Sequence, residues 1–198
     1  MPPHEPAFKD IESSLKRAVA ALRDAGIPFL LGGSLASWAR GGPETRHDLD
    51  LMIRPPDAER ALDALEGAGM RRERPPEEWL VKAWDGDVLI DLIYEPSGMV
   101  IDDEALDRGE ALDVLSMRMP VMALEDVIVT KLAAMTEHEI RYESLLGITR
   151  ALREQIDWDE VHERTRGLAF ADAFFVLLDG LGILPAGASR PSTSPARE

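Results

Sequence analysis

The sequence predicts an α/β (α+β) protein, with a mixed β-sheet core and surrounding helices up to about residue 122 and a helical C-terminal half after it. Short runs of apolar or alternating residues, typical of strands, fall before residue 122. Segments with helical character separate several of these runs. From Leu124 onward the patterns are helical, which predicts the change of architecture.

Eight segments are predicted to be helices, from the spacing of their apolar residues or from the residues that flank them. These helices span 7–24, 35–40, 55–66, 102–109, 124–135, 139–154, 157–166 and 168–181. Ser34 is a favourable N-cap for the second helix, and Gly41-Gly42-Pro43 ends it. Pro55 and Pro56 suit the first turn of the third helix.

Strands are predicted over 29–31, 48–53, 79–84 and 88–94, with one or two more within 113–122, and residues 45–47 are predicted to be a loop. Asp85-Gly86 joins two of these strands and predicts a hairpin. Pro120 cannot donate a backbone hydrogen bond, so we expect its strand at the edge of the sheet.

The chain has 198 residues, enough for one compact domain with a helical extension. We predict a core at 1–122, a helical region at 123–184 and a disordered tail at 185–198, which is rich in Pro, Ser, Ala and Gly. The helical region could pack on the core or carry a surface for a protein partner or a homodimer.

Composition excludes several classes of site and partner. The chain has no Cys, which excludes disulfides, Cys-based zinc sites and thiol nucleophiles. No apolar run is long enough to cross a membrane, and the N-terminus lacks a signal-peptide pattern, so we expect a cytoplasmic protein without membrane contact. The net charge of −15 disfavours a nucleic-acid partner, unless the basic residues between Arg40 and Lys82 form a strip.

A small-residue turn, Gly32-Gly33-Ser34, stands between a predicted strand and a predicted helix. Glycine lets a phosphate approach the backbone closely, and the start of a helix offers free N–H groups. The alternative is a turn with a purely structural role.

Three aspartates form the second candidate group. Asp48 and Asp50 are two apart on a strand, so they share a face, with Cα atoms about 6.6 Å apart, and could hold one Mg²⁺ or bridge a pair. The alternative is a solvated strand face. Asp91 lies inside the apolar run 88–94, where a charge is costly to bury unless it is paired or metal-bound. Asp87 follows a turn and is expected to be only a turn residue.

The glycine turn, the Asp48-Leu49-Asp50 strand 15 positions after Gly33 and the later Asp91 together resemble the nucleotidyltransferase superfamily with the DNA polymerase β-like fold. The local sequence from Gly32 to Asp50 is similar to that of small bacterial members of the superfamily that modify antibiotics or act in toxin–antitoxin pairs. The resemblance implies that Asp48 and Asp50 bind both metals. It implies that Asp91 binds the catalytic metal and acts as the base. The segment 124–133 resembles a helix that places a Lys near the phosphates.

The resemblance therefore implies an enzyme that uses Mg²⁺, in a two-metal site, to transfer a nucleoside monophosphate from an NTP to an acceptor hydroxyl. Gly32, Gly33, Ser34 and Lys131 would hold the nucleotide, although Lys131 could equally be an ordinary exposed helix residue. We expect a small molecule or a protein as acceptor rather than tRNA. The alternative is a component of a two-protein toxin–antitoxin module that uses the fold to bind its partner. Residues 136–143 lack the Lys-Asp pair of toxin-type members.

Overall fold

The structure is a computed structural model and describes residues 8–43 and 48–184. Within them, seven strands form one mixed sheet in the order β3-β4-β5-β2-β1-β7-β6. The strands are β1 Leu30–Leu31, β2 Leu49–Met52, β3 Arg71–Glu73, β4 Leu80–Asp85, β5 Val88–Ile93, β6 Glu110–Val114 and β7 Met117–Val121. β2 and β5 are parallel, as are β1 and β7, and the other neighbours are antiparallel. The predicted α/β class is confirmed.

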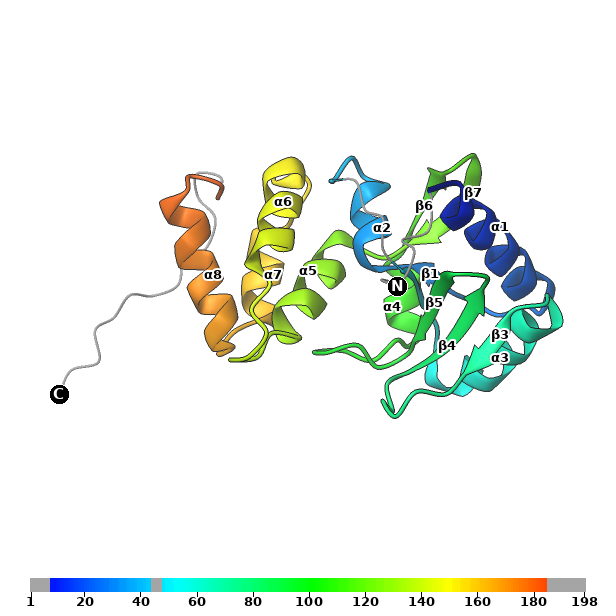
Figure 1. The fold of residues 1–198 in the computed structure, drawn as a ribbon. Coiled ribbons are helices and arrows are strands. Elements are labelled where there is room, and N and C mark those ends of the chain that lie inside the picture. Colours follow the sequence, from blue (N-terminus) through cyan, green and yellow to red (C-terminus); the bar gives the residue numbers. More distant parts are fainter. Residues whose placement is uncertain (1–7, 44–47, 185–198) are drawn as a thin grey trace, which may run out of the picture.

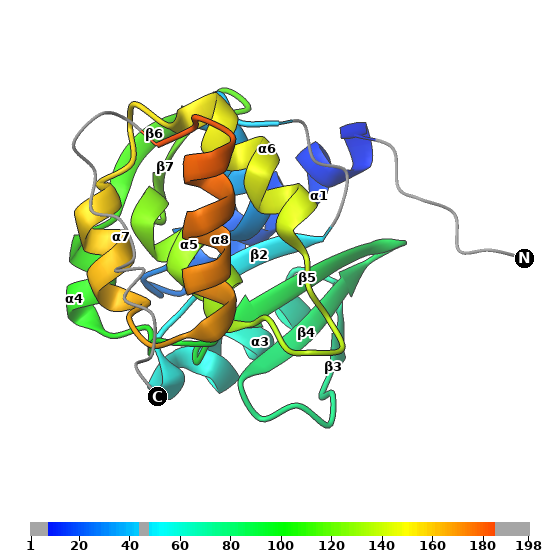
Figure 2. The same ribbon diagram turned by 90° about the vertical axis from the view of Figure 1, so that its left-hand side faces the viewer.

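Helices are interspersed with the strands up to Val121, and the elements described after that residue are all helices. They are α1 Phe8–Asp24, α2 Gly33–Trp38, a 3₁₀ turn Pro55–Asp57 that leads into α3 Ala58–Gly67, α4 Asp103–Asp107, α5 Leu124–Ala133, α6 Tyr142–Leu152, α7 Trp158–Arg164 and α8 Ala169–Gly180. Figure 1 shows α5 between the sheet and the helices α6, α7 and α8. Figure 2 looks at those C-terminal helices in front of the sheet.

The buried apolar side chains form two clusters. The first is formed by residues of the sheet and of the helices that accompany it, and it includes Leu31, Leu51 and Leu92. The second is formed by the C-terminal helices around Phe174 and Phe175. Leu49, Leu51 and Ile53 are fully buried, which confirms the face of the 48–53 segment that was predicted to pack in the core.

Two local predictions are wrong. Ser34 is not the N-cap of the second helix, because α2 already begins at Gly33 and its N-cap is Gly32. The strand that holds Pro120 is not an edge strand, because β7 lies between β1 and β6. Pro120 is tolerated there because β1 has two residues and its ladder with β7 contains just the pair Leu31 and Val121.

β3 was not predicted from the sequence. Arg71-Arg72-Glu73 has neither an apolar run nor an alternating pattern, and it forms the edge of the sheet by pairing with β4. The predicted loop at Thr45–His47 and the predicted tail at 185–198 lie outside the described residues. None of the described helices is long and apolar enough to span a lipid bilayer.

Candidate active site

Asp50 and Asp91 lie side by side on neighbouring strands. They are direct partners in the parallel pairing of β2 with β5. On its other side Asp91 pairs with Lys82 of β4. Paired residues in a sheet point to the same face, so these three side chains form a row across three strands. Asp48 comes one residue before β2 and is exposed.

The glycine turn lies directly against Asp50. The backbone N–H of Gly32 donates to the carbonyl oxygen of Asp50 at 2.8 Å. Gly33 has a φ of +56°, and a Cβ added to it would lie 1.7 Å from Asp50 Oδ2. A side chain at position 33 would therefore displace the carboxylate as well as strain the backbone. The turn thus has a definite role in placing Asp50, in addition to beginning α2.

Burial and repulsion raise the pKa of both strand carboxyls. Desolvation and the charge of Asp91 raise the pKa of Asp50 to about 7, while Lys131 opposes the rise. Desolvation raises the pKa of Asp91 to about 6, and Lys82 opposes it. Asp48 adds to the rise in both groups. The three aspartates are therefore close enough to repel one another.

Asp91 has a carboxylate oxygen that is suited to serve as a metal ligand. Its Oδ1 is buried and has no hydrogen-bond partner among the residues that the structure describes, and Lys82 Nζ is 4.0 Å away. A buried carboxylate oxygen without a donor is costly, and a hard divalent cation such as Mg²⁺ would satisfy it. Nevertheless, no group of three or more His, Asp or Glu within the described part of the chain is gathered closely enough to hold a metal ion.

A cleft of about 660 Å³ is lined by Ser34, Asp48 and Lys131, among other residues. Lys131 is in the last turn of α5. Burial lowers the pKa of the Lys131 ammonium, and the nearby charge of Asp50 opposes this change. The fold therefore brings residues from α2, α5 and the start of β2 to one site, although they are nearly one hundred positions apart in the chain.

Several residues that line the cleft were not predicted as site residues. They are Trp79, Ala134, Met135, Glu139, Arg141, Ser144 and Leu145. Trp79 is 42% exposed, and its carbonyl oxygen accepts hydrogen bonds from Tyr94 N and Glu95 N at 3.1 and 3.2 Å, which hold its backbone in place. Arg141 is close enough to lower the pKa of Lys131. An exposed Trp at the start of a strand was a usable signal, whereas the position of Arg141 depends on how α5 and α6 pack.

Comparisons with known proteins support the fold. The antibiotic-resistance factor ANT(2'')-Ia in solution has a TM-score of 0.63 and 16% identity, over 89% of this chain and 99% of its own. Its complex with adenylyl-2''-tobramycin has a TM-score of 0.61 and 18% identity, over 82% and 98%. The lincosamide antibiotic adenylyltransferase LnuA, bound to lincomycin, has a TM-score of 0.51 and 12% identity, over 69% and 93%. At such identities these likenesses show a shared fold.

A match to a family model shows to which family the chain belongs. No curated protein sequence matches the chain. Residues 10–179 match the model of a family described as uncharacterised nucleotidyltransferase, and this range includes both the sheet and the C-terminal helices. The resemblance inferred from the glycine turn and the three aspartates is thereby confirmed. The chain belongs to this nucleotidyltransferase family and is a transferase of nucleoside monophosphates.

Proposed function

We propose that this enzyme uses Mg²⁺ to transfer a nucleoside monophosphate from an NTP to a hydroxyl group of a small organic molecule or a protein. The observation that supports this proposal is the row of Asp50 and Asp91 against the Gly33 turn, next to Asp48 and the cleft of Lys131. Asp48 and Asp50 would bind both metal ions, and Asp91 would bind the catalytic one. Bound Mg²⁺ would neutralise the triphosphate and stabilise the attacking and leaving oxygens.

The chain's own residues would position the reactants. Gly32, Gly33 and Ser34 would contact the phosphates through the backbone at the start of α2, and Lys131 would bind the triphosphate. Asp91, whose pKa is about 6, would accept the proton of the acceptor hydroxyl. The acceptor oxygen then bonds to the α-phosphorus as the bond to the pyrophosphate oxygen breaks, in an in-line displacement.

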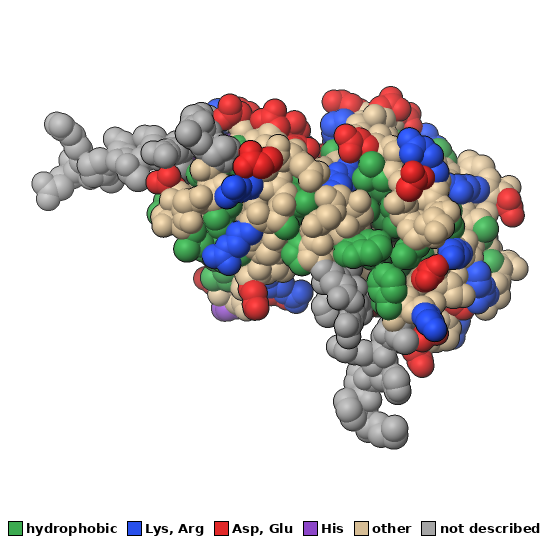
Figure 3. All heavy atoms as spheres, turned by 90° about the horizontal axis from the view of Figure 1, so that it is seen from above, with side chains coloured by type: hydrophobic (Ala, Val, Ile, Leu, Met, Phe, Trp, Pro, Cys, Tyr) green, Lys and Arg blue, Asp and Glu red, His purple; other side chains and the backbone are tan. Residues whose placement is uncertain are grey.

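The basic residues between positions 40 and 82 have acidic partners, which argues against a nucleic-acid acceptor. Arg54 and Arg60 pair with Asp57, Arg72 pairs with Asp63 and Glu66, Arg74 pairs with Glu59, and Arg40 pairs with Glu110. Arg46 lies outside the described residues. On the face drawn in Figure 3, the basic and acidic side chains of the described residues are interspersed and form no continuous basic strip. A polyanion therefore finds no concentrated positive surface on that face.

The cleft itself suits an organic acceptor. Trp79, Met135 and Leu145 supply apolar surface, and Glu139 and Ser144 supply polar groups. Two proteins of this fold carry small organic ligands in their structures, adenylyl-2''-tobramycin in ANT(2'')-Ia and lincomycin in LnuA. We therefore favour a small molecule over a protein side chain as the acceptor.

The second candidate function is protein binding through the C-terminal helices, as in a two-protein toxin–antitoxin module. Leu168, Val176 and Leu181 are exposed on or next to α8, which is the observation that favours it. In this alternative the fold binds a partner without catalysis, so the protein is not expected to bind NTP. The two candidate functions therefore differ in whether the protein binds NTP in a Mg²⁺-dependent way.

Adding Mg²⁺ and an NTP together is expected to raise the melting temperature more than either does alone. The cation removes the repulsion among the three aspartates, and a ligand that binds the native state stabilises it by mass action. Differential scanning calorimetry with each of the four NTPs measures the effect. If no NTP shows Mg²⁺-dependent binding, the catalytic proposal fails and the protein-binding alternative takes its place. If binding is seen, incubation of each α-labelled NTP with cell extract identifies the class of acceptor that gains label.

Replacing Lys131 by Ala is expected to raise the KM for NTP roughly tenfold and to lower kcat less. Its contact with the triphosphate exists before the transition state, so its loss weakens ground-state binding. Steady-state kinetics over a range of NTP concentrations measure both constants. Lys16→Ala is the matched control, because Lys16 is on the exposed face of α1 and pairs with Glu12. A KM equal to that of the control would mean that Lys131 does not contact the nucleotide.

A further inference from the structure

Helix α5 is shared between the two hydrophobic clusters. Val127 packs in the cluster of the sheet, whereas Leu124, Ile128 and Leu132 pack in the cluster of the C-terminal helices. The last turn of α5 carries Lys131 into the cleft. The rotation of α5 about its axis therefore decides where the ammonium group points.

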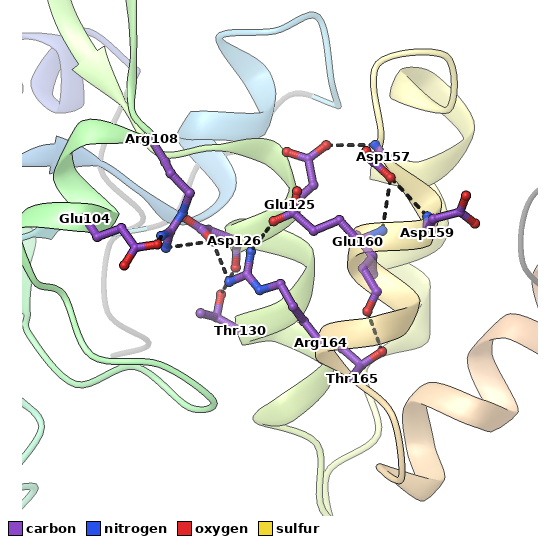
Figure 4. A network of polar contacts seen from close by, with 11 residues as sticks. Glu104, Arg108, Glu125, Asp126, Thr130, Asp157, Asp159, Glu160, Arg164 and Thr165 are labelled. Carbon is purple, nitrogen blue, oxygen red and sulfur yellow. Dashed lines mark hydrogen bonds and ion pairs between the residues drawn. The ribbon is translucent and has the colours of Figure 1, made fainter.

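Asp126, in the first turn of α5, is a fully buried acid between two arginines from different parts of the fold. Arg108, at the end of α4, places Nε 3.3 Å from Asp126 Oδ2. Arg164, at the end of α7, places Nη2 2.6 Å from Asp126 Oδ1. Figure 4 shows the two guanidinium groups converging on this carboxylate. The side chain of Asp126 has an exposed fraction of 0%.

Further contacts hold the same turn of the helix and its partners. Glu125 Oε1 accepts a hydrogen bond from the backbone N–H of Asp157 at 2.8 Å, which ties α5 to the start of α7. Glu160 Oε1 accepts from Arg164 Nη1 at 2.8 Å and fixes that guanidinium (Figure 4). A buried charge held from two directions by partners that are themselves fixed permits little rotation of its helix.

We infer that Asp126 is a positioning residue, whose two ion pairs set the rotation and depth of α5 and so direct Lys131 towards Asp50 and the cleft. Asp126 and Lys131 are five positions apart, which corresponds to a rise of about 7.5 Å and a rotation of about 140° along an α-helix. A rotation that moved Asp126 away from the arginines would move Lys131 away from the cleft by the same angle. The inference rests on the proposed role of Lys131 in binding NTP.

The test measures the dissociation constant for each of ATP, GTP, CTP and UTP with Mg²⁺ by calorimetry, so it does not depend on the acceptor. Asp126→Asn is expected to weaken binding roughly 3- to 30-fold, the range that substitutions in coupling networks produce. Because Asp126 would act through Lys131, the double variant Asp126→Asn, Lys131→Ala should bind no more weakly than Lys131→Ala alone. A residue that only stabilised the fold would leave the dissociation constant unchanged, and one that affected binding by a route other than Lys131 would give additive losses.

Asp57→Asn is the matched control. Asp57 is likewise buried between two arginines, with Oδ1 2.8 Å from Arg60 Nη1 and Oδ2 2.7 Å from Arg54 Nη2, but it belongs to the 3₁₀ turn before α3 and does not line the cleft. It should lower the melting temperature and leave the dissociation constant unchanged. If Asp126→Asn does not fold, Arg164→Gln removes one of the two pairs and should show a smaller, equally non-additive loss.

The outcomes separate this inference from the proposed function. Wild-type protein that binds none of the four NTPs with Mg²⁺ would overturn the proposed function and the inference with it. Wild-type protein that binds NTP, together with an Asp126→Asn variant of unchanged affinity or with additive losses, would overturn the inference alone. In that case Asp126 would join the two parts of the fold without directing Lys131.

Discussion

Replacing Asp50 by Asn is expected to lower nucleotidyl transfer by more than ~100-fold and to leave the protein folded. Groups that merely orient metal ligands cost about 10–100-fold when they are lost, so the loss of a proposed bridging ligand should cost more. The amide keeps the size of the side chain and its place against Gly33. The measurement is the initial rate of label transfer at saturating NTP and Mg²⁺, with circular dichroism to check the fold.

The same variant is expected to be more stable than wild type at neutral pH without metal. The native pKa of Asp50, about 7, is above the value of about 3.9 in an unfolded chain, so the native state binds more protons between these two pH values. Stability therefore falls as pH rises from about 4 to 7, and Asn removes the part of this loss that is due to Asp50. Since Asp50 and Asp91 are coupled, the titration belongs to the pair. Thermal melts at pH 4 and pH 7.5 should show a gap between variant and wild type only at pH 7.5.

Asp87→Asn is the control for Asp50→Asn. Asp87 is an exposed residue in the turn between β4 and β5, close in sequence to the site but not part of it. Its substitution should change neither the transfer rate nor the pH dependence of stability. Near wild-type transfer by Asp48→Asn, Asp50→Asn and Asp91→Asn alike would mean that the active site is assigned wrongly.

Replacing Gly33 by Ala is expected to reduce transfer about 100-fold and to lower the melting temperature. The new Cβ would lie 1.7 Å from Asp50 Oδ2, so the carboxylate must move, and a displacement of about 1 Å at a reacting centre can cost 10²-fold. The positive φ of +56° adds about 1–2 kcal/mol of backbone strain. Transfer rates and thermal melts of the purified variant measure the two effects separately.

Gly26→Ala separates the contact from the backbone strain. Gly26 has a φ of +64°, and no atom of the described residues lies within 4 Å of a Cβ added there. This variant should lose a similar amount of stability from strain and keep its activity. Equal activity in Gly33→Ala and Gly26→Ala would show that the turn does not position Asp50.

Local sequence patterns predicted many of the strands and helices that carry the candidate site. The alternation of residues 48–53 correctly placed Leu49, Leu51 and Ile53 in the core. The Asp85-Gly86 hairpin and the helices after residue 122 were also predicted, with differences of a few residues at their ends. These features depend on neighbours a few positions apart, which is the range over which strand and helix periodicities act.

The failures also have physical reasons. β3 has no apolar pattern because an edge strand can form by backbone pairing alone, here with β4. Ser34 was predicted as a cap from its residue type, but Gly32 is the N-cap and its carbonyl oxygen accepts a hydrogen bond from Ala36 N at 3.0 Å, so α2 begins one residue before the predicted cap. Pro120 lies inside the sheet because β1 is too short to need the missing N–H.

The sequence by itself determined the fold class, the family and the residue types of the proposed site: a glycine turn, an alternating aspartate pair and a later aspartate in an apolar run. Tertiary structure alone decided that Asp50 and Asp91 are direct partners, that Gly33 lies against Asp50, and that Lys131 reaches the cleft while Asp126 is held by Arg108 and Arg164. Periodicity determines which face of an element is buried. The order of strands and the rotation of a helix come from contacts between residues far apart in the chain. Local patterns contain no information about which of these distant residues are in contact.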